Sequence, residues 1–307
     1  MVGGGIFAVL GLAMAVAGHA VPITLAGDGV IALISGLSYA HLGVAIRGDG
    51  GSFTYIEKAF ASPMIAGVAG WLLVVGYVGT LALYATALGD YCATLISGTG
   101  ASHVTMAALS ALGLGVFLVV NLIGAKLSGG VELGVVATKL AILALFAVVG
   151  MLGIHGNHFV PLFNHGVMPS IAAIGLIFVA YEGFELIPNA IDEMENPKRN
   201  LRRAIVIAII VTTVVYVAVA VAALGNLTPA QIQRDQEYVL AVAARPRLGQ
   251  TGFVLIGVAA VLSTGSAINA TLFGAGRLAM VMAREHALPA IFSKQEEKRP
   301  PTLPFWC

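Results

Sequence analysis

Long apolar stretches separated by short polar segments run along the whole chain. Eight of them reach or approach the length of about 20 residues that a helix needs to cross a bilayer. Between them lie Gly, Pro, Asn and charged residues. No alternation of apolar and polar residues persists, so the pattern predicts an all-α integral membrane protein with one domain over residues 1–307. The predicted spans cover residues 2–17, 22–46, 64–97, 104–124, 129–153, 169–192, 201–224 and 251–284.

Composition supports a lipid environment. Hydrophobic residues make up 58% of the chain and charged residues only 10%, and the mean hydropathy is +0.93. A soluble domain carries roughly 25% charged residues, so membrane lipid is the expected surrounding. The net charge of +1 and the absence of a basic tract argue against nucleic acid as a partner. Cys92 and Cys307 lack metal-ligand spacing, and no metal or cofactor is expected.

Lysine and arginine residues are unevenly distributed between the predicted loops. If the first span runs outward from the cytoplasm, three basic residues fall outside: Arg234, Arg245 and Arg247. Twelve fall inside, namely Arg47, Lys58, Lys126, Lys198, Arg199, Arg202, Arg203, Arg277, Arg284, Lys294, Lys298 and Arg299. Because cytoplasmic loops carry the excess of basic residues, this asymmetry predicts a cytoplasmic C-terminus.

Two predicted spans contain a candidate break. The first span opens with Gly3, Gly4 and Gly5, and each glycine weakens a helix by up to about 1 kcal/mol. In the sixth span, residues 178–181 run into an acid and Gly183, about 20 Å from the start of the span. A break at membrane depth must face protein or a water-filled cavity, because unpaired backbone groups are costly in lipid.

The two candidate breaks lie five spans apart, as two inverted repeats of five spans require. Residues 1–153 would form the first repeat and residues 169–307 part of the second. Interrupted helices at corresponding positions indicate a transporter's binding site. Amides of the glycine segment would bind a carboxylate, and freed carbonyls of the second break would bind an ammonium. The predicted substrate-binding residues are Gly3, Gly4, Gly5, Ile6, Val179, Ala180, Tyr181, Glu182 and Gly183. The alternative for the three glycines is close helix packing.

Lys139 lies about 15 Å into the fifth span, near the bilayer centre. A charged lysine there costs at least about 2.5 kcal/mol, so we expect it to gain and lose a proton and to couple proton movement to transport. The alternatives are a structural lysine bonded to open carbonyls and a Schiff-base lysine. Ser263 and Ser266 in the eighth span supply hydroxyls for the same proton site, or bond back to their own helix.

Two further features are expected at the outer surface. Asp28 and Asp90 fall near the outer ends of their spans, where solvation is the simplest expectation. Residues 238–244 form a short apolar run in the longest outer loop, which predicts a surface helix, either capping the mouth of the protein or without a gating role.

Several motifs together resemble the amino acid–polyamine–organocation (APC) transporters. Residues 1–7 are similar to that family's Gly-Ser-Gly-Ile-Phe signature in the first span. Residues 178–185 with 192–200 resemble its sixth span and following loop, and residues 266–284 resemble its eighth. Lys139, in Val-Ala-Thr-Lys-Leu, matches the fifth-span lysine of proton-coupled, sodium-independent prokaryotic members.

The resemblance implies a leucine-transporter-like fold, alternating access around spans one and six, and proton-coupled amino acid transport across the plasma membrane. It further implies that Lys139 replaces a sodium ion and bridges spans one and eight. The family usually has twelve spans, so about eight are expected here, with an incomplete second repeat. The alternatives are a fragment without transport activity, a carrier of polyamines or other organic cations, and, less favoured, a channel or receptor. An enzyme would need a His, Asp or Cys cluster at one depth, and the sequence has none.

Overall fold

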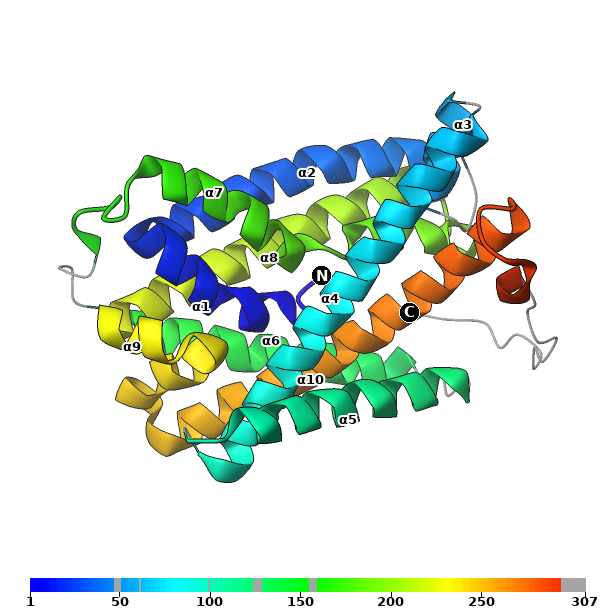
Figure 1. The fold of residues 1–307 in the computed structure, drawn as a ribbon. Coiled ribbons are helices and arrows are strands. Elements are labelled where there is room, and N and C mark those ends of the chain that lie inside the picture. The colour runs from blue at the N-terminus through cyan, green and yellow to red at the C-terminus, as the bar shows by residue number, and fades with distance from the viewer. Residues whose placement is uncertain (47–50, 61, 99, 124–128, 155–158, 294–307) are drawn as a thin grey trace.

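The structure is a computed structural model that describes residues 1–46, 51–60, 62–98, 100–123, 129–154 and 159–293. Within these ranges every regular element is a helix (Figure 1), as the predicted fold class requires. The elements are α1 (Gly5–Ala17), η1 (Gly18–Ala20), α2 (Val21–Ala45), α3 (Ser52–Phe60), α4 (Pro63–Ser97), α5 (His103–Leu122), α6 (Gly129–Met151), α7 (Val167–Ile177), η3 (Phe178–Tyr181), η4 (Phe184–Glu193), α8 (Pro197–Asn226), α9 (Pro229–Arg234), η5 (Gln236–Tyr238), α10 (Val239–Arg284) and η6 (Ala290–Ser293).

Seven stretches of the described chain are long and apolar enough to cross a membrane, against eight predicted. The difference arises at the first two predicted spans, which form one stretch, Gly5–Ala45. Here α1 has only 13 residues and continues through the single turn of η1 into α2. Gly18, with φ 59°, turns the chain between α1 and η1, because glycine adopts a positive φ without steric cost.

The short helix α1 lies inside the bundle, and the longer helices surround it (Figure 1). Ile6, Phe7 and Ala13 of α1 are fully buried. The surrounding helices pair as α2 with α8, α4 with α5 and α10, and α6 with α8 and α10. On α5 only Met106 is fully buried, Leu109, Leu114 and Phe117 pack partly against the core, and many of the other apolar side chains are exposed, as expected for a helix whose solvent is lipid.

We name the two ends of the helical bundle after the short helices α3 and α9, and contacts between distant segments show which helix ends lie at each. At the α3 end, the end of α2 meets the start of α8, because a side chain at Gly43 would touch Leu201. At the α9 end, Arg247 donates a hydrogen bond to the carbonyl of Gly153 (3.0 Å). Arg47, Lys126, Lys294, Lys298 and Arg299 lie outside the described residues. Among the described basic residues, the α9 end holds Arg234, Arg245 and Arg247, and the elements of the α3 end carry Lys58, Lys198, Arg199, Arg202, Arg203 and Arg284.

The prediction of a helix at residues 238–244 is confirmed for residues 239–244, but the predicted position of this helix at the surface is wrong. Tyr238 closes η5, and residues 239–244 form the first turns of α10, with Val239 and Leu240 fully buried. The segment η5 directly before them packs onto α1, where a side chain at Gly11 would overlap the backbone of Gln236, and α10 itself also packs against α1. Gly249 (φ 61°, ψ −153°) then kinks α10 and separates this buried part from the long span that follows.

Candidate functional site

The glycine segment at the start of α1 packs directly against the interrupted helix that follows α7. A Cβ atom at Gly5 would overlap the backbone of Ala180 in η3. Only glycine permits two backbones to approach this closely. The structure therefore brings together the two segments that the sequence marks as breaks, although they lie far apart along the chain.

Gly4 and Gly3 differ in the space around them. A Cβ atom at Gly4 would lie 2.9 Å from a ring carbon of Tyr84 on α4 and 3.1 Å from the methyl group of Thr264 on α10. At Gly3 the nearest atom would be the Cβ of Ala267, at an ordinary contact distance of 3.4 Å. Close packing therefore explains a glycine at Gly4 and Gly5, but it does not require one at Gly3.

The helix of the sixth predicted span is interrupted between two 3-10 segments. The α-helix α7 ends at Ile177, η3 continues to Tyr181, and η4 begins at Phe184. Gly183, between η3 and η4, has φ 113°, a conformation that L-residues with side chains rarely adopt. The break thus lies at the Glu182–Gly183 step.

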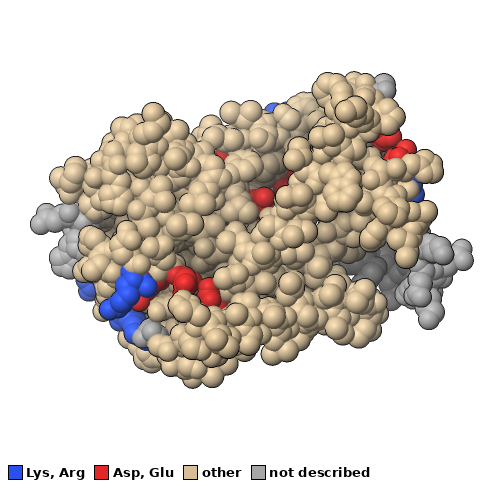
Figure 2. Space-filling view, in the orientation of Figure 1, with Lys and Arg blue, Asp and Glu red and all other residues tan. Residues whose placement is uncertain are grey.

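Two carboxylates flank this step. Thr80 of α4 donates its hydroxyl hydrogen to Oε2 of Glu182 (3.0 Å). The backbone N–H of Gly183 donates to Oε2 of Glu185 (2.7 Å). The bond from Gly183 holds the interrupted backbone, and the bond from Thr80 ties the Glu182 side chain to α4. In Figure 2 acidic atoms are visible near the middle of the face, apart from the charged patches toward its lower left and right edges.

The carbonyl groups of the break already accept some protein donors. The hydroxyl of Tyr216 on α8 donates to the carbonyl of Ala180 (3.0 Å) and lies 3.3 Å from that of Met1. The carbonyl of Val179 accepts from the backbone N–H of Glu182 (3.3 Å). The sequence analysis missed Tyr216 and Thr80, although a hydroxyl within an otherwise apolar span is a readable signal. Tyr216 links both interrupted segments to α8.

Lys139 is buried on α6, with 3% of its surface exposed. Its helix packs against α8 and α10, and α10 carries both predicted serines. Ser263 is fully buried, and its hydroxyl has no hydrogen-bond partner among the described residues, whereas Ser266 is half-buried. Thr264 instead bonds back to the carbonyl of Ala260 (2.8 Å). Back-bonding to the helix is therefore observed at Thr264 and not at Ser263.

The expectation that Asp28 and Asp90 are solvated is wrong. Asp28 has none of its surface exposed, and Asp90 has 5%. Position along a span gives the depth of a residue, but it does not show which face meets a neighbouring helix. Asp28 lies on the side of α2 that packs against α8 and η3, and η5 packs against α4, the helix of Asp90.

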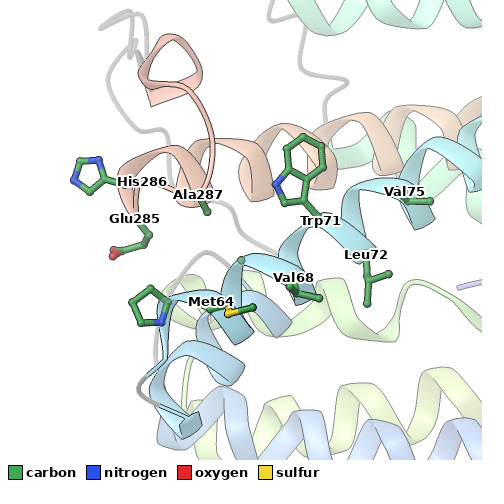
Figure 3. A pocket seen from close by; sticks show the side chains of 10 residues that line it. Met64, Val68, Trp71, Leu72, Val75, Glu285, His286 and Ala287 are labelled. Carbon is green, nitrogen blue, oxygen red and sulfur yellow. The ribbon is translucent and has the colours of Figure 1, made fainter.

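An apolar groove of about 560 Å³ lies away from the break (Figure 3). Met64, Val68 and Trp71 of α4 line it together with residues 285–287, which follow α10. None of the predicted site residues lines this groove. At its polar end, burial and the neighbouring Glu285 carboxylate raise the pKa of Glu57 on α3.

Within the described ranges, no three His, Cys, Asp or Glu side chains come together to hold a metal ion.

Buried polar groups around interrupted helices in a lipid-facing bundle define a multi-pass membrane protein of the transporter class. Residues 1–307 match the model of the amino acid permease family. The chain is 36% identical over 297 residues to uncharacterized protein MJ0609 of Methanocaldococcus jannaschii and 30% identical over 300 residues to the inner membrane transport protein YbaT of Escherichia coli. Both alignments cover 96% of this chain and 68% of the relative.

The chain is also 26% identical over 324 residues to the branched-chain amino acid permease BcaP of Bacillus subtilis, an alignment that covers 100% of this chain and 69% of the relative. The chain belongs to the amino acid permease family, and the predicted resemblance to APC transporters is confirmed. It spans about two thirds of the length of these three relatives.

Proposed function

We propose that the chain carries amino acids across the plasma membrane by alternating access, with protons as the coupling ion. The observation that carries this proposal is the direct contact between the glycine segment of α1 and the interrupted η3 segment, at Gly5 and Ala180. In a permease, two interrupted helices in contact at the middle of the bundle supply backbone groups to a small polar solute.

The substrate site combines the start of α1 with the second break. The first bond within α1 runs from the N–H of Ala8 to the carbonyl of Gly4, so the N–H groups of Gly5, Ile6 and Phe7 are not used inside the helix. Such groups at a helix N-terminus suit the carboxylate of an amino acid. Glu182, with the backbone from Val179 to Gly183, supplies acceptors for the ammonium group.

Lys139 is the proposed coupling group. It is buried near the middle of α6, where a permanent charge is costly. Ser263 and Ser266 lie on α10, which packs against α6. A buried hydroxyl without a partner, as at Ser263, suits a group that accepts a different contact when the lysine changes its charge.

Replacing Lys139 tests the coupling. In the intact protein reconstituted into proteoliposomes, Lys139→Ala should abolish uptake driven by a pH gradient and affect equilibrium binding much less. Lys58→Ala, at an exposed position on α3, is the matched control and should leave both unchanged. A Lys139→Ala variant that still concentrates substrate with the wild-type pH dependence refutes the coupling role. Loss of folded protein together with both activities supports the structural alternative.

The proposed orientation places the α3 end and the C-terminus in the cytoplasm. The supporting observation is the larger number of basic residues on the elements of that end. Single cysteines at Asn200 and at Gln233, both exposed, test this orientation once the native cysteines are replaced. An impermeant thiol reagent added to intact cells should label Gln233→Cys and not Asn200→Cys. Labelling of Asn200→Cys in intact cells contradicts the orientation.

A carrier of polyamines or other organic cations is the second candidate. The two carboxylates at the break, Glu182 and Glu185, favour it because both attract cations. Competition for binding separates the two candidates. For an amino acid carrier, a zwitterionic amino acid displaces a bound amino acid, and a diamine without a carboxylate does not. The reverse order of potency favours the cation carrier.

A further inference from the structure

Asp28 is a fully buried carboxyl group that the proposed mechanism does not use. It lies on α2 about 10 Å from the start of that helix at Val21. None of its surface is exposed, and neither Oδ1 nor Oδ2 has a hydrogen-bond partner among the described residues. An ionised carboxylate normally collects several donors, and one that is buried without them gives up its charge by taking a proton.

The hydroxyl groups around Asp28 already donate to backbone carbonyls. Thr24, one turn earlier on the same face, donates to Ala20 (3.1 Å), and Thr213 of α8 donates to Ile209 (2.8 Å). A side chain at Gly29 would overlap that of Thr213, so Thr213 lies directly against this part of α2. These threonines keep their own helix carbonyls as partners, which leaves the Asp28 carboxyl without a donor.

Tyr181 brings a hydroxyl group to this part of α2 from outside the helical ladders. It closes η3 and donates to the carbonyl of Leu25 (2.8 Å). Leu25 precedes Asp28 by three residues and therefore lies on the same face of α2. The carboxyl group is close enough to interact electrostatically with the Tyr181 hydroxyl. The Asp28 carboxylate, one turn further along the same face of α2 than Leu25, is therefore an alternative acceptor for this hydroxyl.

No described charged side chain opposes Asp28 from the elements packed against α2. The basic residues of α8 begin at the α3 end, and Arg203, the nearest of them in sequence, precedes Thr213 by ten residues, or about 15 Å. The helices α1 and α7 contain no titratable residue. The side chains of Asp192 and Glu193 lie outside the described part of η4. The remaining titratable groups on α2, on its neighbours and at the step between η3 and η4 are Tyr39, His41, His19, Tyr181, Glu182, Glu185 and Tyr216.

We infer that Asp28 is a proton-binding site between α2, η3 and α8, and that Tyr181 reports its protonation state to the interrupted helix. In the protonated state the carboxyl group is neutral, and Tyr181 donates to Leu25. On deprotonation the O–H bond of the acid breaks, the proton passes to water, and the carboxylate keeps the electron pair. The Tyr181 hydroxyl then donates to the carboxylate.

The change of hydrogen-bond acceptor at Tyr181 affects the interrupted helix because Tyr181 lies beside the break. It directly precedes Glu182, and its ring packs edge-on against that of Tyr216, with centroids 5.4 Å apart. Tyr216 in turn donates to the carbonyl of Ala180. A change of partner at Tyr181 is therefore passed directly to Glu182 at the break and, through Tyr216, to the carbonyl of Ala180. This site requires neither Lys139 nor any particular substrate, so it stands or falls independently of the proposed function.

Infrared difference spectroscopy between acidic and alkaline pH tests the site on the intact purified protein in nanodiscs. The wild-type protein should show the carbonyl stretch of a protonated carboxyl group that disappears as the pH rises, and aspartate labelled with carbon-13 should shift this band. Asp28→Asn, the neutral isostere of the protonated acid, should remove the band. Asp90→Asn, at another buried acid, is the matched control and should leave the Asp28 band in place.

A second variant tests the part played by Tyr181. Tyr181→Phe removes the donor that would stabilise the carboxylate, so the carboxyl band should persist to higher pH than in the wild type. The inference is overturned if no aspartate band titrates in the wild type, if the band survives in Asp28→Asn, or if it is removed equally by sodium ions at constant pH. A titration unchanged by Tyr181→Phe overturns the role of the tyrosine.

Discussion

The glycine segment at the start of α1 and the interrupted segment that follows α7 meet in the bundle, and different contacts hold their backbones. In the glycine segment, Gly4 and Gly5 are fixed by contact with Tyr84, Thr264 and Ala180, where a side chain has no room. In the second segment, side-chain and backbone hydrogen bonds hold the chain, and they involve Thr80, Tyr216 and Glu185.

This difference shows which of the two segments indicates better what kind of ligand binds. Close packing alone accounts for Gly4 and Gly5, so a substitution there disturbs the fold before it disturbs any ligand. The contacts of the second segment are polar, and a polar contact can exchange one partner for another. The carboxylate of Glu182 is therefore a more direct indication of what binds than the glycines are.

The largest effect is expected at Gly5. Because a methyl group there would overlap the Ala180 backbone, Gly5→Ala should destabilise the protein by about 3 kcal/mol, the upper range for overpacking. The thermal unfolding midpoint of the purified protein measures this loss. Gly3→Ala is the matched control, since its methyl group would make only an ordinary contact with Ala267. Equal midpoints for the two variants would show that the segments do not touch as described.

A smaller effect is expected at Gly183. Its φ of 113° is strained for any residue with a Cβ, so Gly183→Ala should cost about 1–2 kcal/mol. Gly175→Ala, in α7 of the same span, has open space around it and should be neutral or stabilising by up to about 1 kcal/mol. Both effects are read from thermal unfolding. A Gly183→Ala protein as stable as the Gly175→Ala protein would mean that the break does not need this backbone conformation.

The smallest effect on stability is expected at Thr80. Thr80→Val keeps the shape of the side chain but removes the donor to Glu182, which should cost about 1 kcal/mol and change the affinity for substrate. Thr80→Ser retains a hydroxyl and should bind substrate like the wild type. Titration of substrate by calorimetry compares the variants. If Thr80→Val binds as tightly as Thr80→Ser, the hydroxyl does not orient the Glu182 carboxylate for the ligand.

The sequence was informative about features that depend on the residues of a single helix. Apolar length and the positions of Gly and Pro place the spans, and the helix of the sixth span ends at Ile177, next to the predicted break at residues 178–185. The burial of Lys139 also agrees with its depth in the fifth span. The substrate and coupling roles of these residues remain predictions.

The sequence was misleading where the face of a helix mattered. Asp28 and residues 239–244 were expected at the surface, because one lies near a span end and the others lie in a predicted loop. Both are buried, since α8 and η3 cover Asp28 and η5 docks on α1. No periodic pattern in a wholly apolar span distinguishes a face against lipid from a face against another helix.

The sequence by itself therefore determined the class of protein, the approximate helices and the position of the break that follows α7, because hydropathy and glycine content act locally. Only the tertiary structure decided that Gly5 meets Ala180, that Tyr216 joins both segments, and that the carboxyl group of Asp28 is buried without a hydrogen-bond partner among the described residues. The physical reason is that lipid and protein interior are equally apolar, so the hydrophobic pattern cannot select which helix faces pair. That choice rests on small residues and buried polar groups, whose partners come from distant parts of the chain.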